Sequence, residues 1–301
     1  VECAIEPVSQ WGWYSDILLE LGLDVKLVDV YKSKLIAGTK LKNDKVDSHI
    51  LAELLRSNFL PQAYLAPKET RELRELLRWR IFLVRIRARI KNRISGMLSH
   101  YGLICPRTDT FGKSGREWLE KQSFSPLYAD ERSSLLKIFD ALSPEIKKVS
   151  FLIEAKAELG EETKILMSIP GIGAFTAMVI MAEVGTFERF GAPEKLACFA
   201  GLVSSSYSSG GKLKFGSITK RGSPHLRWAM IEATNTVRPS WGHLYDFYSR
   251  IKLKKGSKVA RVALARKVLT IAWHLVKKKE PFMAQSHSIG KFRQREAVIS
   301  S

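Results

Sequence analysis

Ile169-Pro170-Gly171-Ile172-Gly173 opens the stretch that decides the fold of the second half of the chain, and an apolar run over residues 174–184 follows it. Gly171 and Gly173 can adopt φ > 0 and leave backbone N–H groups open, so a phosphate can approach the N-terminus of a helix over 174–184. This pattern is typical of a helix-hairpin-helix, a module that holds DNA by its backbone. An ordinary turn before a core helix explains the same residues equally well.

The same stretch continues through Gly201-Leu202-Val203, a serine-rich segment over residues 204–209, and Gly210-Gly211. It closes on Lys220-Arg221-Gly222 and Leu226-Arg227. We expect a serine-rich loop here, with the glycine hairpin and a cluster of cations close to it. A serine-rich loop taken alone is more often a flexible linker.

The composition indicates a polyanionic partner. The 301 residues include 49 Lys and Arg against 30 Asp and Glu, a net charge of +19, and the excess is spread along the chain. Nucleic acid is the commonest such partner, with an anionic membrane as the alternative. No segment has the ~18 apolar residues of a membrane span, and no signal-peptide pattern is present. Cys3, Cys105 and Cys198 lie far apart, which suits a reducing cytoplasm and argues against disulfides or structural zinc.

The first 30 residues have the rhythm of a parallel α/β layer. Residues 1–7 predict a short buried strand that ends at a carboxylate, residues 11–22 a helix, and residues 24–30 a second strand. One such unit cannot cover both faces of a sheet, so we expect the chain to begin inside a fold that lacks its first strands.

Three carboxylates in this region form a candidate metal site. Glu6 ends the first strand, and Asp44 and Asp47 stand three residues apart at the start of a helix expected over 47–58. Oxygen ligands suit Mg²⁺, and paired metals would stabilise the attacking and leaving oxygens of a phosphodiester. For Asp44 and Asp47 alone, a helix cap is the more common explanation.

Residues 68–100 predict one long helix with an apolar seam made of Leu73, Leu76, Leu83, Ile86, Ile90, Ile94 and Met97. Many arginines lie between these positions, and the helix has no acidic residue after Glu75. We therefore expect Arg85, Arg89 and Arg93 to contact a phosphate backbone, although a charged face is usually only solvated. Helices over 135–142 and 145–159 would complete an antiparallel hairpin or coiled coil suited to dimerisation.

The C-terminal part predicts helices over residues 224–237, 241–251 and 258–276, with a basic loop at 252–256. Residues 283–301 have no periodicity and predict a disordered tail.

Taken together, these motifs resemble the insertion-sequence transposases with a DEDD tetrad, of the IS110 type, which are RNA-guided bridge recombinases. The resemblance covers roughly residues 1–282. It rests on Glu6, on residues 42–47, and on these C-terminal motifs: residues 169–173, Phe199-Ala200-Gly201-Leu202, Ser208-Ser209-Gly210-Gly211, residues 218–222, Leu226-Arg227 and Arg266-Lys267.

The resemblance implies an α/β plus all-α fold in four parts. These are a partial RuvC-like domain over 1–66, a coiled-coil dimerisation region over 67–160, a helical C-terminal transposase domain over 161–282, and the tail. It also implies a DNA transposase with Mg²⁺, a guide RNA, a homo-dimer or tetramer, no membrane, and a place in the prokaryotic cytoplasm at the nucleoid.

The resemblance also assigns roles to residues. Glu6, Asp44 and Asp47 correspond to three of four acidic metal ligands, and Ser209 to a nucleophile that forms a covalent link to DNA, with Ser208 as the nearest competitor. Cations near the serine would neutralise the phosphate of the transition state: Lys212, Lys220, Arg221 and Arg227.

The chain departs from the family pattern at three places. The fourth acid, an aspartate on the first strand, has no counterpart, Pro7-Val8-Ser9 follows Glu6, and Asn43 and Ser48 replace the usual Thr and Ala. We therefore keep two alternatives: a nucleic-acid-binding remnant without catalysis, and a junction resolvase that uses metal alone.

Overall fold

The computed structural model describes residues 1–37, 44–156, 160–209 and 212–283, with the backbone alone at 34, 37, 44–46, 206–209 and 212–215. The chain divides into two compact units, Val1–Glu72 and Leu73–Ser301. In these described ranges no helix is both long and apolar enough to cross a bilayer. The expected tail lies outside the described residues from 284 onward.

The first unit contains the expected β-α-β arrangement. Strand β1 (Glu2–Ile5) pairs in parallel with β2 (Asp24–Leu27), and α1 (Trp11–Glu20) connects them. Helices α2 (Val30–Ala37) and α3 (Asp44–Arg56) follow, and α3 packs against β1. The expectation that the first strand is buried was wrong. In this described two-stranded sheet β1 has β2 as its one strand partner, and its side chains stay partly exposed, whereas Val25 and Leu27 of β2 are buried.

Arg71 fastens α1 within this unit. Its guanidinium donates to the carbonyl oxygens of Ala66 and Gly12 at 3.1 and 3.2 Å and forms an ion pair with Asp16. A Cβ on Gly12 would lie 2.8 Å from the Arg71 Nη1 atom. The absence of a side chain at Gly12 therefore lets the arginine reach the helix backbone.

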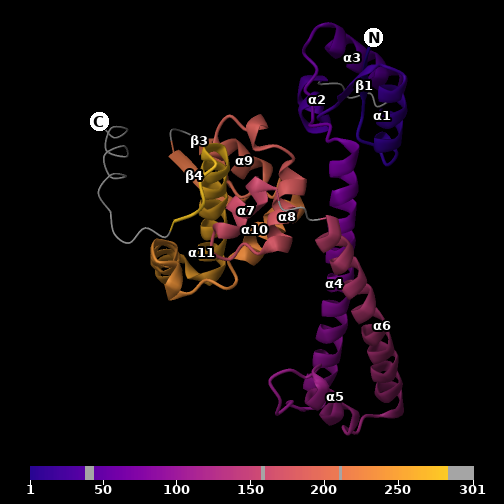
Figure 1. The fold of residues 1–301 in the computed structure, drawn as a ribbon, viewed down its shortest axis with the longest axis vertical. Helices are drawn as coiled ribbons and strands as arrows, with labels where there is room; N and C mark the ends of the chain where they lie inside the picture. Colours follow the sequence, from indigo (N-terminus) through magenta and orange to yellow (C-terminus); the bar gives the residue numbers. More distant parts are fainter. Residues whose placement is uncertain (38–43, 157–159, 210–211, 284–301) are drawn as a thin grey trace. The chain divides into compact units, whose positions relative to one another are not determined.

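The second unit begins with two long helices that run side by side (Figure 1). These are α4 (Lys68–His100) and α6 (Pro126–Lys156), joined through the short α5 (Lys113–Glu120). They are antiparallel, since Arg80 near the start of α4 bonds Ser150 near the end of α6, whereas Arg93 bonds Glu131. The apolar seam of α4 is covered by α6 and by other helices of the same chain.

The expected break between two helices at residues 143–144 was wrong, because α6 continues through Pro144. Proline in a helix interior removes one hydrogen bond and usually kinks or ends the helix. Here apolar residues on both sides of it pack against α4, Leu136 and Phe139 before it and Ile146 and Val149 after it. Tertiary packing therefore holds the helix across the proline.

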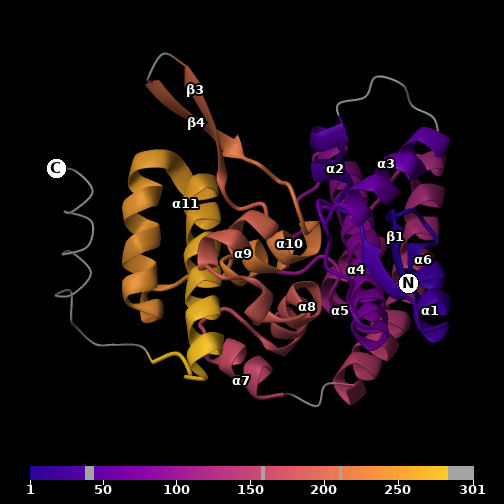
Figure 2. The same cartoon turned by 90° about the horizontal axis from the view of Figure 1, so that it is seen from above.

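The rest of the second unit is a helical body from which a β-hairpin projects (Figure 2). The elements are α7 (Glu161–Ser168), α8 (Ala174–Val184), η1 (Phe187–Arg189), α9 (Pro193–Phe199), β3 (Ser204–Ser209), β4 (Lys212–Ile218), α10 (Pro224–Ala233), η2 (Pro239–Trp241) and α11 (His243–Lys278). Its largest core cluster is built from α7 to α11, with Leu166, Ile180, Leu196, Leu226 and Leu264 fully buried.

Two C-terminal boundaries differ from the expectation. Helix α10 ends at Ala233, where Thr234 turns its hydroxyl back onto the Ile231 carbonyl oxygen. The expected basic loop over 252–256 is helical except at Gly256, whose φ of 81° and ψ of 166° redirect α11. Lysine and leucine are good helix formers, so the chain departs from the helix only at the glycine.

A buried carboxylate joins three helices of this unit. The Glu183 side chain of α8 is 6% exposed, and Arg78 of α4 donates to its Oε1 at 2.9 Å. The Ser223 hydroxyl, which caps α10 by accepting from the Leu226 N–H, donates to its Oε2 at 2.8 Å. Arg74 completes the contact by donating to the Ala182 and Glu183 carbonyl oxygens at the C-terminal end of α8.

Glu183→Ala should lower the free energy of unfolding by about 2–4 kcal/mol, because Arg78 and Ser223 lose a buried acceptor. Urea unfolding followed by circular dichroism measures this. Glu75→Ala is the matched control, since Glu75 also pairs with Arg78 but its side chain is 75% exposed. That control should unfold like the wild type. Equal losses in the two variants would contradict the role given to the buried carboxylate.

Candidate catalytic and nucleic-acid-binding site

The serine-rich segment is a strand, not the loop that the sequence suggested. Strands β3 and β4 pair antiparallel, with Ser209 opposite Lys212 and Ser208 opposite Leu213. Hydroxyl and glycine residues are typical of loops, but here Ser206 to Ser209 pair in register with Phe215 to Lys212 of the opposite strand, after an irregularity between Ser204 and Ser206. Gly210 and Gly211, between Ser209 and Lys212, lie outside the described residues. The candidate nucleophile therefore stands at the far end of a hairpin.

The other end of the hairpin is held by close backbone contacts. Gly201 has a φ of 65°, and a Cβ there would lie 2.4 Å from the Arg221 carbonyl oxygen. Gly222 has a φ of 89°, and a Cβ there would lie 2.0 Å from the Phe199 carbonyl oxygen. Both positions require glycine for conformation and for space. The motifs around residues 199–202 and 220–222 are thus two halves of one contact.

Arg227 fixes this contact from the side. Its Nη1 donates to the Lys220 carbonyl oxygen at 3.0 Å and to the Ala200 carbonyl oxygen at 3.2 Å. The Thr219 N–H donates to the Val203 carbonyl oxygen at 2.8 Å, so Lys220 and Arg221 directly follow the paired strands. Lys220 has a φ of 54°, in the left-handed region, and both Lys220 and Arg221 are exposed.

The expected single cluster of serine and cations was therefore wrong. Only Lys212 pairs with Ser209, whereas Lys220, Arg221 and Arg227 lie at the base. A strand rises ~3.3 Å per residue, so about 17 Å separates the two ends of β3. This distance could not be predicted from the sequence, because a serine-rich segment is expected to form a compact loop.

The turn between α7 and α8 requires glycine at its first glycine position, Gly171, for structural reasons. Gly171, between α7 and α8, has a φ of 86°, and a Cβ there would lie 2.2 Å from the Ala233 carbonyl oxygen and 2.4 Å from the Trp241 ring. Gly173 precedes α8, and nothing lies within 4 Å of its Cβ position. Gly171 thus packs against the core, and the open position next to the α8 N-terminus is Gly173.

The candidate metal ligands belong to the first unit. Glu6 follows β1 and is half-buried, and Asp47 is half-buried in the first turn of α3, which begins at Asp44, three residues before the expected start at 47. The Asp44 side chain lies outside the described residues. Among the residues whose side chains are described, no three His, Cys, Asp or Glu side chains gather as a metal site would need. An all-carboxylate donor set suits a hard divalent ion.

The basic face of α4 is partly occupied within the chain. Arg93 pairs with Glu131 of α6 at 3.0 Å, which raises the pKa of Arg93, and Arg85 lies 6.0 Å from the Trp228 ring. Arg89 is exposed and bonds to none of the described residues. The sequence of α4 alone does not reveal that Glu131 and Glu183 pair with its arginines, because both acids come from other helices.

His225 on α10 is a titratable group that the sequence did not single out. It is half-buried beside the Glu183 network, and its Nδ1 atom has no hydrogen-bond partner among the described residues. Burial, and then the positive charge of Arg78, hold the pKa of His225 below its ordinary value. The folded protein therefore favours neutral histidine here.

Two family models match this chain. The model described as "Transposase IS116/IS110/IS902 family" matches residues 163–250, and the IS110 DEDD model described as "Transposase" matches residues 4–103. The chain belongs to the IS116/IS110/IS902 family of transposases. The first match contains the hairpin with Ser209, and the second contains Glu6, Asp44 and Asp47.

Curated transposases are similar over most of the chain. The "Probable family 20 transposase" of Pseudomonas aeruginosa is 26% identical over 92% of this chain and 84% of its own length. The transposase for insertion sequence element IS1111A of Coxiella burnetii is 26% identical over 90% of this chain and 76% of its own length. The pilin gene-inverting protein of Moraxella bovis is 31% identical over 45% of this chain and 43% of its own length.

Gly171→Ala should destabilise this transposase strongly, because the new methyl group meets the Ala233 carbonyl and the φ of 86° is unfavourable for alanine. Gly173→Ala should leave the unfolding midpoint near that of the wild type, since its φ is −85° and the space is open. Thermal unfolding of both variants checks this. Equal behaviour of the two would contradict the assignment of Gly171 to the core.

His225→Gln should make stability less dependent on pH. A histidine whose pKa is lowered in the folded state makes its full contribution to stability above its unfolded pKa of ~6.5. That contribution is lost as the pH falls below this value and through the folded pKa. The urea midpoint of the wild type should therefore fall more between pH 7.5 and 5.5 than that of the variant. A steeper fall in the variant would oppose the expected sign.

Proposed function

We propose that this transposase cuts and rejoins DNA through the hydroxyl of Ser209, with Mg²⁺ held by Glu6, Asp44 and Asp47. The observation that carries the proposal is the place of Ser209. It ends a hairpin strand inside the family match, opposite a lysine and away from the packed core.

The chemistry exchanges one phosphodiester for another. The Ser209 Oγ atom loses its proton to a base and bonds to phosphorus, while the bond from phosphorus to one deoxyribose oxygen breaks and that oxygen takes up a proton. A hydroxyl from another strand end then attacks the phosphoserine, forms the new DNA bond and returns the proton to Ser209. The number of phosphoester bonds is unchanged, so no external energy source is required.

The carboxylates and the serine belong to different units of the chain. A serine hydroxyl is weak at its free pKa and needs activation. When bound, Mg²⁺ would supply charge to the reacting phosphate oxygens. Glu6 and Asp47 are half-buried in the first unit, and their oxygen donors fit that ion.

The cations divide between two tasks in this proposal. Lys212, opposite Ser209, would offset the charge that develops on the reacting phosphate. Lys220 at the base of the hairpin, and Arg89 on α4, would hold flanking phosphates instead. Arg85, Arg93, Arg221 and Arg227 have interactions within the chain and would contribute less.

The N-terminus of α8 would add a phosphate contact. Gly173 precedes this helix with open space around it and no side-chain cap, which leaves amides for an anion. Gly171 would support this contact indirectly by fixing the turn. This is the helix-hairpin-helix function that the sequence suggested.

A guide RNA and a dimer or tetramer are part of the proposal through the resemblance to RNA-guided recombinases. The net charge of +19 suits two nucleic acids. The apolar seam of α4 is buried against α6, so subunits would meet through other surfaces. Phe82 of α4 and Phe151 of α6 are exposed and available for this.

The test is a covalent adduct on a denaturing gel, formed with a labelled plasmid that carries the flanks of the element, Mg²⁺ and the co-expressed RNA. Ser209→Ala should abolish the adduct while salt-sensitive DNA binding remains. Ser208→Ala, one residue earlier in the same strand, should retain it and is the matched control. Asp47→Asn should reduce the adduct strongly.

Three other outcomes would decide against this assignment. An adduct that persists in Ser209→Ala would rule out Ser209 as the nucleophile. Cleavage with free ends and no adduct would favour a resolvase that uses metal alone. DNA binding without cleavage at any Mg²⁺ or Mn²⁺ concentration would favour a non-catalytic DNA-binding protein.

A further inference from the structure

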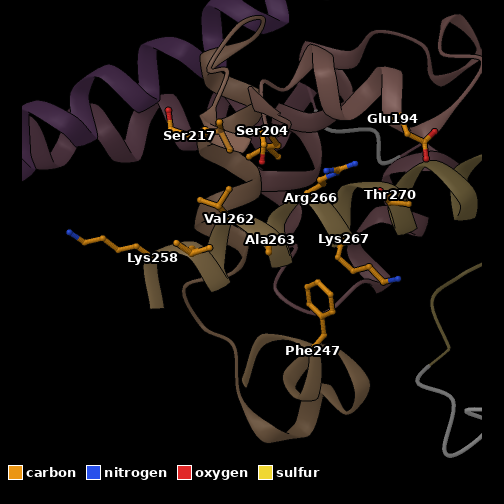
Figure 3. A pocket seen from close by; sticks show the side chains of 14 residues that line it. Glu194, Ser204, Ser217, Phe247, Lys258, Val262, Ala263, Arg266, Lys267 and Thr270 are labelled. Atoms are coloured by element: carbon orange, nitrogen blue, oxygen red, sulfur yellow. The ribbon is translucent and has the colours of Figure 1, made fainter. Parts of the chain in front are cut away.

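A pocket lies between the base of the β3–β4 hairpin and the second half of α11 (Figure 3). It encloses about 760 Å³, within the range of ~300–1,000 Å³ found for small-molecule sites. The lining residues of the second half of α11, from Lys258 to Thr270, come after the family match that ends at residue 250, whereas the other lining residues lie within it. Among the candidate catalytic residues whose side chains are described, none lines it.

The pocket has a positive side. Lys258, Arg266 and Lys267 contribute three cations from one helix, against one acid, Glu194. None of the three cations forms an ion pair or hydrogen bond within the described part of the chain. By contrast Lys277, a later lysine of α11 that does not line the pocket, does pair with Glu188, at 2.9 Å. The pocket cations are therefore available to an anion.

The pocket also has an apolar surface and hydroxyl groups. Leu202, Val262 and Ala263 contribute the apolar surface, and Ser204, Ser217 and Thr270 the hydroxyls. Phe247 points into the pocket from the side opposite Ser204 and Arg266 (Figure 3). A ligand that satisfies this lining has a flat apolar part, polar edges and a negative charge. A nucleotide has all three.

We propose that this pocket holds one unpaired nucleotide of a nucleic-acid strand, with its phosphate on Arg266 and Lys267 and its base on Phe247. The proposal rests on the proposed function to the extent that a nucleic acid is the substrate. A base in a duplex has both faces stacked, so only an unpaired or extruded base can present a face to an aromatic ring.

The position of the pocket gives the nucleotide a role. It lies at the base of β3, about 17 Å along the strand from Ser209. A nucleic-acid strand bound there would be oriented relative to Ser209, although the pocket residues would not touch the reacting phosphate. Arg266 and Phe247 are thus positioning residues.

Fluorescence anisotropy on the full chain tests the proposal with labelled twelve-nucleotide oligo-dT, oligo-rU, an abasic strand of equal length, and a twelve-base-pair duplex. Phe247→Leu keeps an apolar side chain but removes the ring, and stacking contributes enough to expect about a tenfold loss for oligo-dT. Its affinity for the duplex and the abasic strand should stay within about twofold of wild type.

Arg266→Gln provides a second variant on an exposed position, so folding is preserved. Arg261→Gln is its control, because it removes the same charge from the same helix at an exposed position that does not line the pocket. Arg266→Gln should weaken oligo-dT binding several-fold more than Arg261→Gln. Preference of the wild type for oligo-rU over oligo-dT, or the reverse, would identify which strand occupies the pocket.

Equal losses for Arg266→Gln and Arg261→Gln, or equal losses for single strand and duplex in Phe247→Leu, would overturn the pocket proposal. These results do not depend on catalysis. The Ser209 adduct could be present while the pocket fails, or absent while single-strand binding still depends on Phe247, so the two proposals fail separately.

Discussion

The buried carboxylate of Glu183 is the interaction on which the second unit depends. A charge with so little exposure is tolerated only when it is paired and hydrogen-bonded, and here Arg78 and Ser223 provide both. The consequence extends beyond the ion pair. Ser223 also caps α10, and its N–H donates to the Phe199 carbonyl oxygen, next to the close contact of Gly222. One carboxylate thus links the long helix α4 to the base of the hairpin that carries Ser209.

The hairpin combines a rigid base with a distant tip. At the base, Gly201 and Gly222 allow backbone to approach backbone, and Arg227 bonds two carbonyl oxygens across the contact. These three residues belong to the motifs by which the family is recognised, and in the structure their role is to hold the backbone at the base of the hairpin. The tip, by contrast, is defined by the pairing of Ser209 with Lys212. Family motifs therefore mix residues that hold the scaffold with residues proposed to react.

Local patterns in the sequence predicted local structure well. The apolar spacing over 68–100 predicted α4 at its observed bounds, and the strand–helix–strand rhythm of the first 30 residues predicted the β-α-β unit. Errors arose where distant residues decide the outcome. Packing against α4 keeps α6 helical across Pro144, and pairing with β4 makes the serine-rich segment a strand, β3. The carboxylates of Glu6 and Asp47 could be proposed from sequence, but the pocket beside α11 could not, because its residues come from five separate stretches of the chain.

The inward arginines of α4 change the meaning of the chain's net charge. Arg74 is bound to a helix end and Arg78 to a carboxylate, and Arg80 donates to a serine hydroxyl while its guanidinium lies over the Phe175 ring. The salt dependence of nucleic-acid binding reports the number of counterions released from neutralised phosphates. Cations that are bound to groups of the protein itself do not neutralise phosphates and so release no counterions. The formal value of +19 is therefore an upper limit on the electrostatic footprint, and part of this basicity is the means by which a long helix is attached to its domain.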